Sequence, residues 1–122
     1  MYEVKIIDKS KKIVGISWIG KVTPDDVRQA NDKLAVIMKE LASEQFDVLV
    51  NMSEITVLLQ DTQKEIVKHQ EWLLQNGMQR AAVIVSSTIA KMQLKRTAKE
   101  SEHSNEYHFQ SETEALEFLR AG

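Results

Sequence analysis

Two short and almost uninterrupted apolar runs, FDVLV (46–50) and AAVIV (81–85), constrain this chain more than any other feature. Such runs are typical of strands that are covered on both faces, as in a parallel sheet. A longer segment with helical spacing of apolar residues follows each run, and helices that join parallel strands form right-handed crossovers. The sequence therefore predicts an α/β fold in which helices pack against a mainly parallel sheet.

The remaining strands are predicted near the two ends of the chain. YEVKIID (2–8) alternates apolar and polar residues, and IVGISWIG (13–20) resumes after a polar turn, so the pair predicts an antiparallel hairpin. EYHF (106–109) predicts a last, short strand. The complete prediction is a mixed, mainly parallel sheet with an antiparallel N-terminal strand and about four helices, in the order ββαβαβαβα.

Capping signals mark the first two predicted helices. Thr23 can cap the first helix, with Pro24 in its first turn. Its apolar stripe consists of Val27, Ala30, Leu34, Met38 and Leu41. We expect Asp61 or Thr62 to cap the second helix and Gly77 to end it.

Two further helices are predicted after the apolar run at 81–85. The third, over about 88–101, follows three hydroxyl residues that can cap it, and we expect Ile89 and Met92 to face inward and its lysines to face outward. The closing helix follows Ser111, which stands three residues before Glu114 at the spacing of a capping box.

Composition narrows the classes of protein that this chain can be. Its 122 residues fit one domain (1–122), and the absence of cysteine excludes disulfides, thiolate zinc sites and cysteine nucleophiles. A net charge of −2 gives no reason to expect nucleic acid, and the apolar runs are too short for stable membrane insertion. Phosphate-cradling and nucleophile-elbow motifs are also absent. We therefore expect a cytoplasmic protein with no cofactor and no catalysis.

The histidines offer only weak candidates for a site. His69 and Trp72 are three residues apart on the second predicted helix and share a face, as a ligand-binding pair or as a half-buried contact with the sheet. His103 and His108 stand near the third helix and the last strand, where a zinc site would need a further ligand. We predict no metal site.

A stripe of basic residues marks the third predicted helix. Lys91, Lys95 and Lys99 recur every four residues and therefore share one side of that helix. Ser87 and Thr88 precede it at the carboxyl end of a strand, where open α/β sheets usually bind ligands. These residues fit an anionic headgroup or phosphate, and they also fit a solvated lysine face with ordinary caps.

The segment ITVLL (55–59) places five residues of mostly apolar character after the strand FDVLV. If it is exposed, it requires a cover such as a partner subunit, a lipid or a membrane surface. The alternative is that it folds back over the core.

The segments GKVTPDD (20–26), FDVLVNMSEI (46–55) and RAAVIV (80–85), together with the order of elements, resemble the STAS superfamily, specifically its SpoIIAA-like branch. This branch is related in fold to the CRAL-TRIO lipid-binding domains. The resemblance covers almost the whole chain and implies a bacterial binding or regulatory module, several relatives of which are dimers.

The resemblance also implies that the chain could be regulated by phosphorylation. The best-known STAS members are anti-anti-sigma factors, which bind a kinase anti-sigma factor until a serine in an Asp-Ser-(Ser/Thr)-Gly motif is phosphorylated. That motif falls here near residues 59–62, where Asp61 is the acid, Thr62 is the hydroxyl in register and glycine is missing. Thr62 is thus the candidate phosphosite, and the alternative is that Asp61 or Thr62 only caps the second helix.

Together these features predict a non-catalytic module that acts through protein–protein or small-ligand contacts, as a homodimer or with another protein. Contact would come from the apolar Ile55, Val57, Leu58 and Leu59 and from the polar Ser87, Thr88 and Lys91. The first alternative is a carrier or sensor of a small lipid-like or anionic ligand, with an acyl chain beneath ITVLL. The second is the switch at Thr62.

Overall fold

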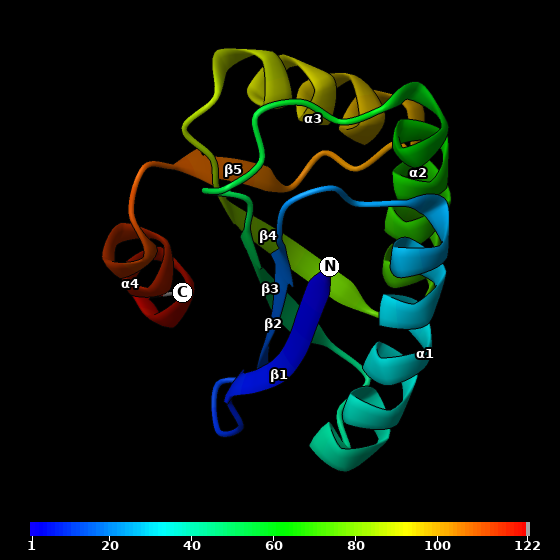
Figure 1. Ribbon diagram of the computed structural model, residues 1–122. Helices are drawn as coiled ribbons and strands as arrows, with labels where there is room; N and C mark the ends of the chain where they lie inside the picture. The colour runs from blue at the N-terminus through cyan, green and yellow to red at the C-terminus, as the bar shows by residue number, and fades with distance from the viewer. Residues whose placement is uncertain (122) are drawn as a thin grey trace.

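The computed structural model describes residues 1–121, in which five strands form one sheet (Figure 1). The strands lie in the sheet in chain order: β1 (Tyr2–Asp8), β2 (Ile13–Trp18), β3 (Phe46–Asn51), β4 (Met78–Ile84) and β5 (Glu106–Phe109). β1 pairs antiparallel with β2, and the pairs from β2 to β5 are parallel. The predicted element order and the mixed, mainly parallel sheet are confirmed.

The helices follow from this topology. They are α1 (Pro24–Leu41), α2 (Gln60–Gln75), α3 (Thr88–Glu100) and α4 (Glu112–Ala121). Because the sheet grows in one direction from β2 to β5 and parallel crossovers are right-handed, α1, α2 and α3 must lie on one face. Figure 1 shows this layer on one side of the sheet and α4 on the other. Among residues 1–121, no helix is long and apolar enough to cross a membrane.

The core is divided by the sheet into a large and a small part. The large part lies against α1 to α3 and includes Val14, Val48 and Val83. The small part lies against α4 and includes Leu49 and Leu119. β3 and β4 therefore bury side chains on both faces, which explains their nearly continuous apolar runs.

Local signals at α1 and at the end of α2 behave as expected. Thr23 accepts a hydrogen bond from the backbone N–H of Asp26, whose carboxylate accepts the N–H of Thr23 in return. Gly77 follows α2 with φ of +106°, and a Cβ there would lie 1.8 Å from the carbonyl oxygen of Glu44. Only glycine fits both the backbone angle and the space.

The start of α2 differs from the prediction. Its N-cap is Leu59, and among the described residues no side chain accepts a hydrogen bond at this cap. Asp61 and Thr62 lie inside the first turn, so the expectation that one of them caps the helix is wrong. The carboxylate of Asp61 instead accepts the neighbouring N–H of Thr62, at 2.8 Å.

The orientation of α3 also differs from the prediction. Ile89 and Met92 face outward, with 60% and 61% of their surface exposed. The side that packs on the core carries Ala90, Leu94 and Ala98, whose spacing of four residues defines the true buried stripe. Ile89 and Met92 fall outside this stripe and therefore face solvent.

Candidate functional site

The loop between β3 and α2 divides its apolar residues between the core and the surface. Ile55 and Leu58 are buried and belong to the large core. Val57 and Leu59 remain 53% and 48% exposed. The loop thus follows both predicted alternatives at once, because Ile55 and Leu58 fold back over the core while Val57 and Leu59 stay exposed.

Hydrogen bonds hold this loop against the beginning of α3. The side chain of Gln93 accepts the backbone N–H of Leu58 at 2.7 Å and donates to the carbonyl oxygen of the same residue at 3.0 Å. The hydroxyl of Ser87 donates to the carbonyl oxygen of Thr56 at 2.6 Å, while its oxygen also caps α3. Sequence analysis did not identify Gln93, because a polar residue on a helix flank carries no signal of its partner.

The loop and the beginning of α3, which Ser87 and Gln93 hold together, both expose large apolar side chains. These side chains are Val57, Leu59, Ile89 and Met92, and we call them the apolar surface. Figure 1 shows the loop running beside α3 before it enters α2. Of the residues predicted for contact, Val57 and Leu59 belong to it, whereas Ile55 and Leu58 support it from below.

The candidate phosphosite is buried. Thr62 has no exposed surface, and its hydroxyl donates a hydrogen bond to the carbonyl oxygen of Val22 at 2.7 Å. This bond ties α2 to the segment before α1. A kinase could reach the Thr62 hydroxyl only after the start of α2 had moved, so the phosphorylation switch stays a prediction that requires such a movement.

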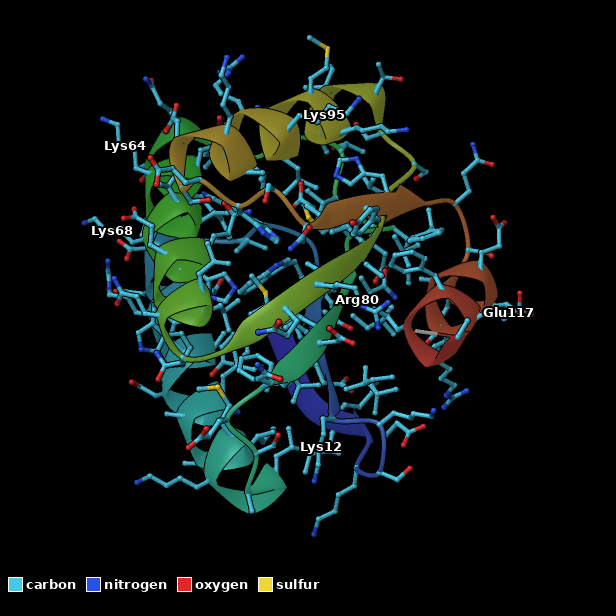
Figure 2. The ribbon with its side chains drawn as sticks, turned by 180° about the vertical axis from the view of Figure 1, so that it is seen from behind. Lys12, Lys64, Lys68, Arg80, Lys95 and Glu117 are labelled. Carbon is cyan, nitrogen blue, oxygen red and sulfur yellow. The ribbon has the colours of Figure 1, made fainter. Side chains whose placement is uncertain are left out.

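The opposite side of α3 forms a second, basic surface. Lys91, Lys95 and Lys99 line an open groove of about 720 Å³ between α3 and β5, which we call the basic groove. Its floor includes His103, Glu106 and His108, and its other wall includes Tyr107, Phe109 and Phe118. Figure 2 shows Lys95 on α3 above the edge strand. Lys91 therefore lies with the lysines of the groove, and Thr88 is an exposed residue at the start of α3.

A helix-ending turn places His103 beneath α3. The N–H of His103 donates to the carbonyl oxygen of Ala98 at 2.8 Å, and that of Glu102 donates to Lys99 at 3.2 Å, with Glu102 at φ of +59°. This is the Schellman arrangement, in which glycine usually occupies the left-handed position. The chain thereby reverses under the helix and carries the imidazole back toward β5.

A chain of hydrogen bonds runs beneath the groove. The hydroxyl of Ser101 donates to the side-chain oxygen of Gln70 at 2.9 Å, and the Gln70 amide donates to Glu106 at 3.5 Å. The other carboxylate oxygen of Glu106 lies 3.0 Å from Nε2 of His108. Both oxygens of this buried carboxylate are thus in use.

His103 lies beside this network without joining it, and Nδ1 of His108 also lacks a partner within residues 1–121. Its residue surface is 5% exposed, yet neither ring nitrogen has a hydrogen-bond partner within residues 1–121. Burial lowers the pKa of His103, while the negative charge of Glu106 acts in the opposite direction. An unsatisfied buried polar group costs free energy, so burial of this imidazole without a partner lowers the stability of the fold.

His69, by contrast, belongs to the core. It packs edge-on against Trp18 with ring centroids 5.7 Å apart, and its Nδ1 is hydrogen-bonded to the side-chain oxygen of Asn31. Burial lowers the pKa of His69 to about 4. Trp72 is half-buried and packs against the same core. This pair follows the predicted helix–sheet contact.

Metal binding finds no support in the part of the chain that the structure describes. It contains no group of three or more histidine, aspartate or glutamate side chains arranged to hold a metal ion. His103 and His108 have only Glu106 near them in the groove, and that carboxylate is already hydrogen-bonded on both oxygens.

The order of elements and the five-stranded mixed sheet define a STAS-type α/β domain. The family model described as SpoIIAA-like matches residues 13–120, so the chain belongs to the SpoIIAA-like family. Domains of this family are generally non-catalytic and regulatory.

Among solved structures, the NMR structure of the protein TM1081 is similar. It is 13% identical with a TM-score of 0.62, and the match covers 100% of this chain and 90% of that chain. At this identity the likeness supports the fold alone. No curated protein matches the chain.

Proposed function

We propose that this chain is a non-catalytic regulatory module that works by protein–protein contact and uses the apolar surface to bind a second copy of itself. The observation that carries the proposal is the exposure of Val57, Leu59, Ile89 and Met92, which lies between 48% and 61%. Large apolar side chains gathered on one surface mark interaction sites in soluble proteins.

The exposed apolar residues of this chain are concentrated on the loop and α3, which favours a specific contact there. Within residues 1–121, seven large apolar residues are exposed, and four of them belong to this one surface. Hydrogen bonds from Ser87 and Gln93 fix the loop, so two of the four side chains are held in place before any partner arrives. A preformed contact loses less conformational entropy on binding.

The composition of the surface favours a second copy as the occupant. Its centre is apolar, and charged residues of both signs, including Asp61 and Arg96, lie exposed on the neighbouring turns of α2 and α3. Homodimer contacts have more apolar centres than transient ones, and a two-fold axis lets the same patch cover itself. Mixed rim charges allow acids of one copy to face bases of the other.

A lipid carrier is less well supported. The cavity between the sheet and α2 has a volume of about 30 Å³, which is room for about one water molecule. Ile55 and Leu58 fill the space beneath the loop where an acyl chain was expected. Within residues 1–121, this cavity is too small to hold an acyl chain.

The proposal is tested by sedimentation and light scattering over a range of concentrations. We expect a dimer for the unchanged chain and a monomer for the double variant Ile89→Glu with Met92→Glu. Both side chains are exposed, so the melting temperature of the variant monomer should change little.

Val36→Glu provides the matched control. Val36 is 58% exposed on α1, away from the apolar surface, so its replacement adds one charge of the same sign at a similarly exposed position. A monomer at all concentrations for the unchanged chain, or dissociation by Val36→Glu as well, would exclude the proposed contact.

A further inference from the structure

Strand β5 is an edge of the sheet, and half of its backbone groups point away from β4. The carbonyl oxygens of Asn105 and Phe109 accept hydrogen bonds from β4 at 2.9 and 3.1 Å. Because alternate residues of a strand face opposite neighbours, the N–H and C=O groups of Glu106 and His108 point to the free side. Within residues 1–121, no hydrogen bond outside the strand ladder reaches them.

The basic groove runs along this free edge. The side chains of Glu106 and His108 are only 7% and 8% exposed, although both residues as a whole are half-buried. Their exposure therefore comes disproportionately from the backbone. An unpaired edge of this kind is a template for another strand.

The two walls of the groove differ in character. On the α3 side, Lys91 and Lys95 are four residues apart, which is about 6 Å along a helix. Two residues of an extended strand span nearly the same length, about 6.7 Å. On the α4 side, Tyr107 stacks on Phe118 with ring centroids 4.7 Å apart, and Tyr107 is 39% exposed.

From this geometry we propose that β5 binds an extended peptide segment of a partner protein as a sixth strand, with acidic residues facing α3 and apolar residues facing Tyr107 and Phe118. Successive residues of a strand point to opposite faces, so an alternating acidic and apolar sequence matches both walls. Three lysines against one carboxylate, Glu106, leave the α3 wall positive.

His103 gives the groove a specific polar contact in addition to charge. Its ring nitrogens are unpartnered and have almost no accessible surface, so an imidazole N–H reaches a peptide carboxylate only when the side chain turns toward the groove. The carboxylate of Glu106 does not compete for the imidazole, because Gln70 and His108 already occupy its two oxygens.

This inference does not depend on the proposed dimer. The basic groove and the apolar surface share no lining residue, and peptide binding and self-association are measured in separate experiments on the unchanged chain. Binding to the groove can therefore succeed or fail independently of self-association.

The test uses a short, end-blocked peptide that alternates glutamate with leucine, titrated into the full chain and followed by NMR. We expect the amides of Glu106 and His108 to shift and to gain protection from hydrogen exchange. A peptide of the same composition with its glutamates and leucines in separate blocks should bind at least tenfold more weakly.

Backbone pairing is tested by methylating the peptide on alternate amide nitrogens. Methyl groups on the edge that faces β5 should abolish binding, whereas methyl groups on the opposite edge should leave it unchanged. Equal effects of the two methylated peptides would overturn the proposal, because side-chain attraction alone does not distinguish the two edges.

Charge variants test the lysine wall. Lys91→Glu with Lys95→Glu should weaken the alternating peptide about tenfold, whereas Lys68→Glu on α2, outside the groove in Figure 2, should change affinity less than twofold. Equal weakening by Lys68→Glu would overturn the proposal.

Displacement of the peptide by inorganic phosphate at similar affinity would assign the groove to small anions instead. Protection of the edge amides that rises with protein concentration alone would assign it to a second copy.

Discussion

The two sides of α3 differ in whether their buried polar groups have hydrogen-bond partners. On the side of the loop, Gln93 and Ser87 satisfy the backbone of residues 56–58, and apolar side chains remain outside. On the side of β5, lysines stand in solvent and the buried imidazole of His103 has no partner within residues 1–121. On the loop side, which we call the closed side, the chain itself supplies the hydrogen-bond partners. On the β5 side, the imidazole is left without a partner among the described residues.

This difference distinguishes polar groups that stabilise the fold from polar groups that a partner could bind. A buried polar group that is satisfied within the chain contributes to stability and requires nothing further. One that is left unsatisfied lowers stability, and chains keep such groups most often where a ligand or partner satisfies them. The comparison predicts opposite responses to substitution on the two sides.

The largest expected effect concerns neighbouring leucines of the closed side. Leu58→Ala should lower the free energy of unfolding by about 3–4 kcal/mol, because it leaves a cavity in the core. Leu59→Ala removes a side chain that is 48% exposed and should cost less than about 1 kcal/mol. Urea denaturation measures both, and equal losses would contradict the division of the loop into inner and outer residues.

The sequence predicted the fold more completely than the site, for a physical reason. Strand burial and helix caps are local signals, and FDVLV, Thr23 and Gly77 were all assigned correctly from them. The outward position of Ile89 depends on which side of α3 meets the core, which is a tertiary property. The same limit applies to Gln93 and to the burial of Thr62, since both depend on partners 35 and 40 residues away.

A second prediction concerns the pH dependence of stability, to which the buried His69 and His103 both contribute. The pKa of His69 is about 4 in the folded chain against an ordinary value of 6.5, because burial disfavours the charged imidazole. Between these values the unfolded chain binds a proton that the folded chain does not, so stability falls as pH drops from 6.5 toward 4. The total loss is about 3 kcal/mol.

The measurement is urea denaturation at several pH values between 7 and 4.5. The variant His69→Gln cannot titrate and should lose most of this dependence. The lowered pKa of His103 acts in the same direction, so His103→Leu should remove the remainder. A pH dependence that persists in the double variant would assign it to carboxylates instead.

The smallest expected effect has the opposite sign and separates the two sides of α3 most directly. His103→Leu should raise the free energy of unfolding by about 1 kcal/mol, because it replaces an unsatisfied buried imidazole with an apolar side chain. Gln93→Leu is the matched control on the closed side. It should lower the same quantity by about 1–2 kcal/mol, because the backbone N–H and C=O of Leu58 lose their partner. Both values are measured at pH 7, where the His103 imidazole is neutral in the folded chain. A loss of stability in both variants would mean that His103 is satisfied as fully as Gln93, and the two sides of α3 would then be alike.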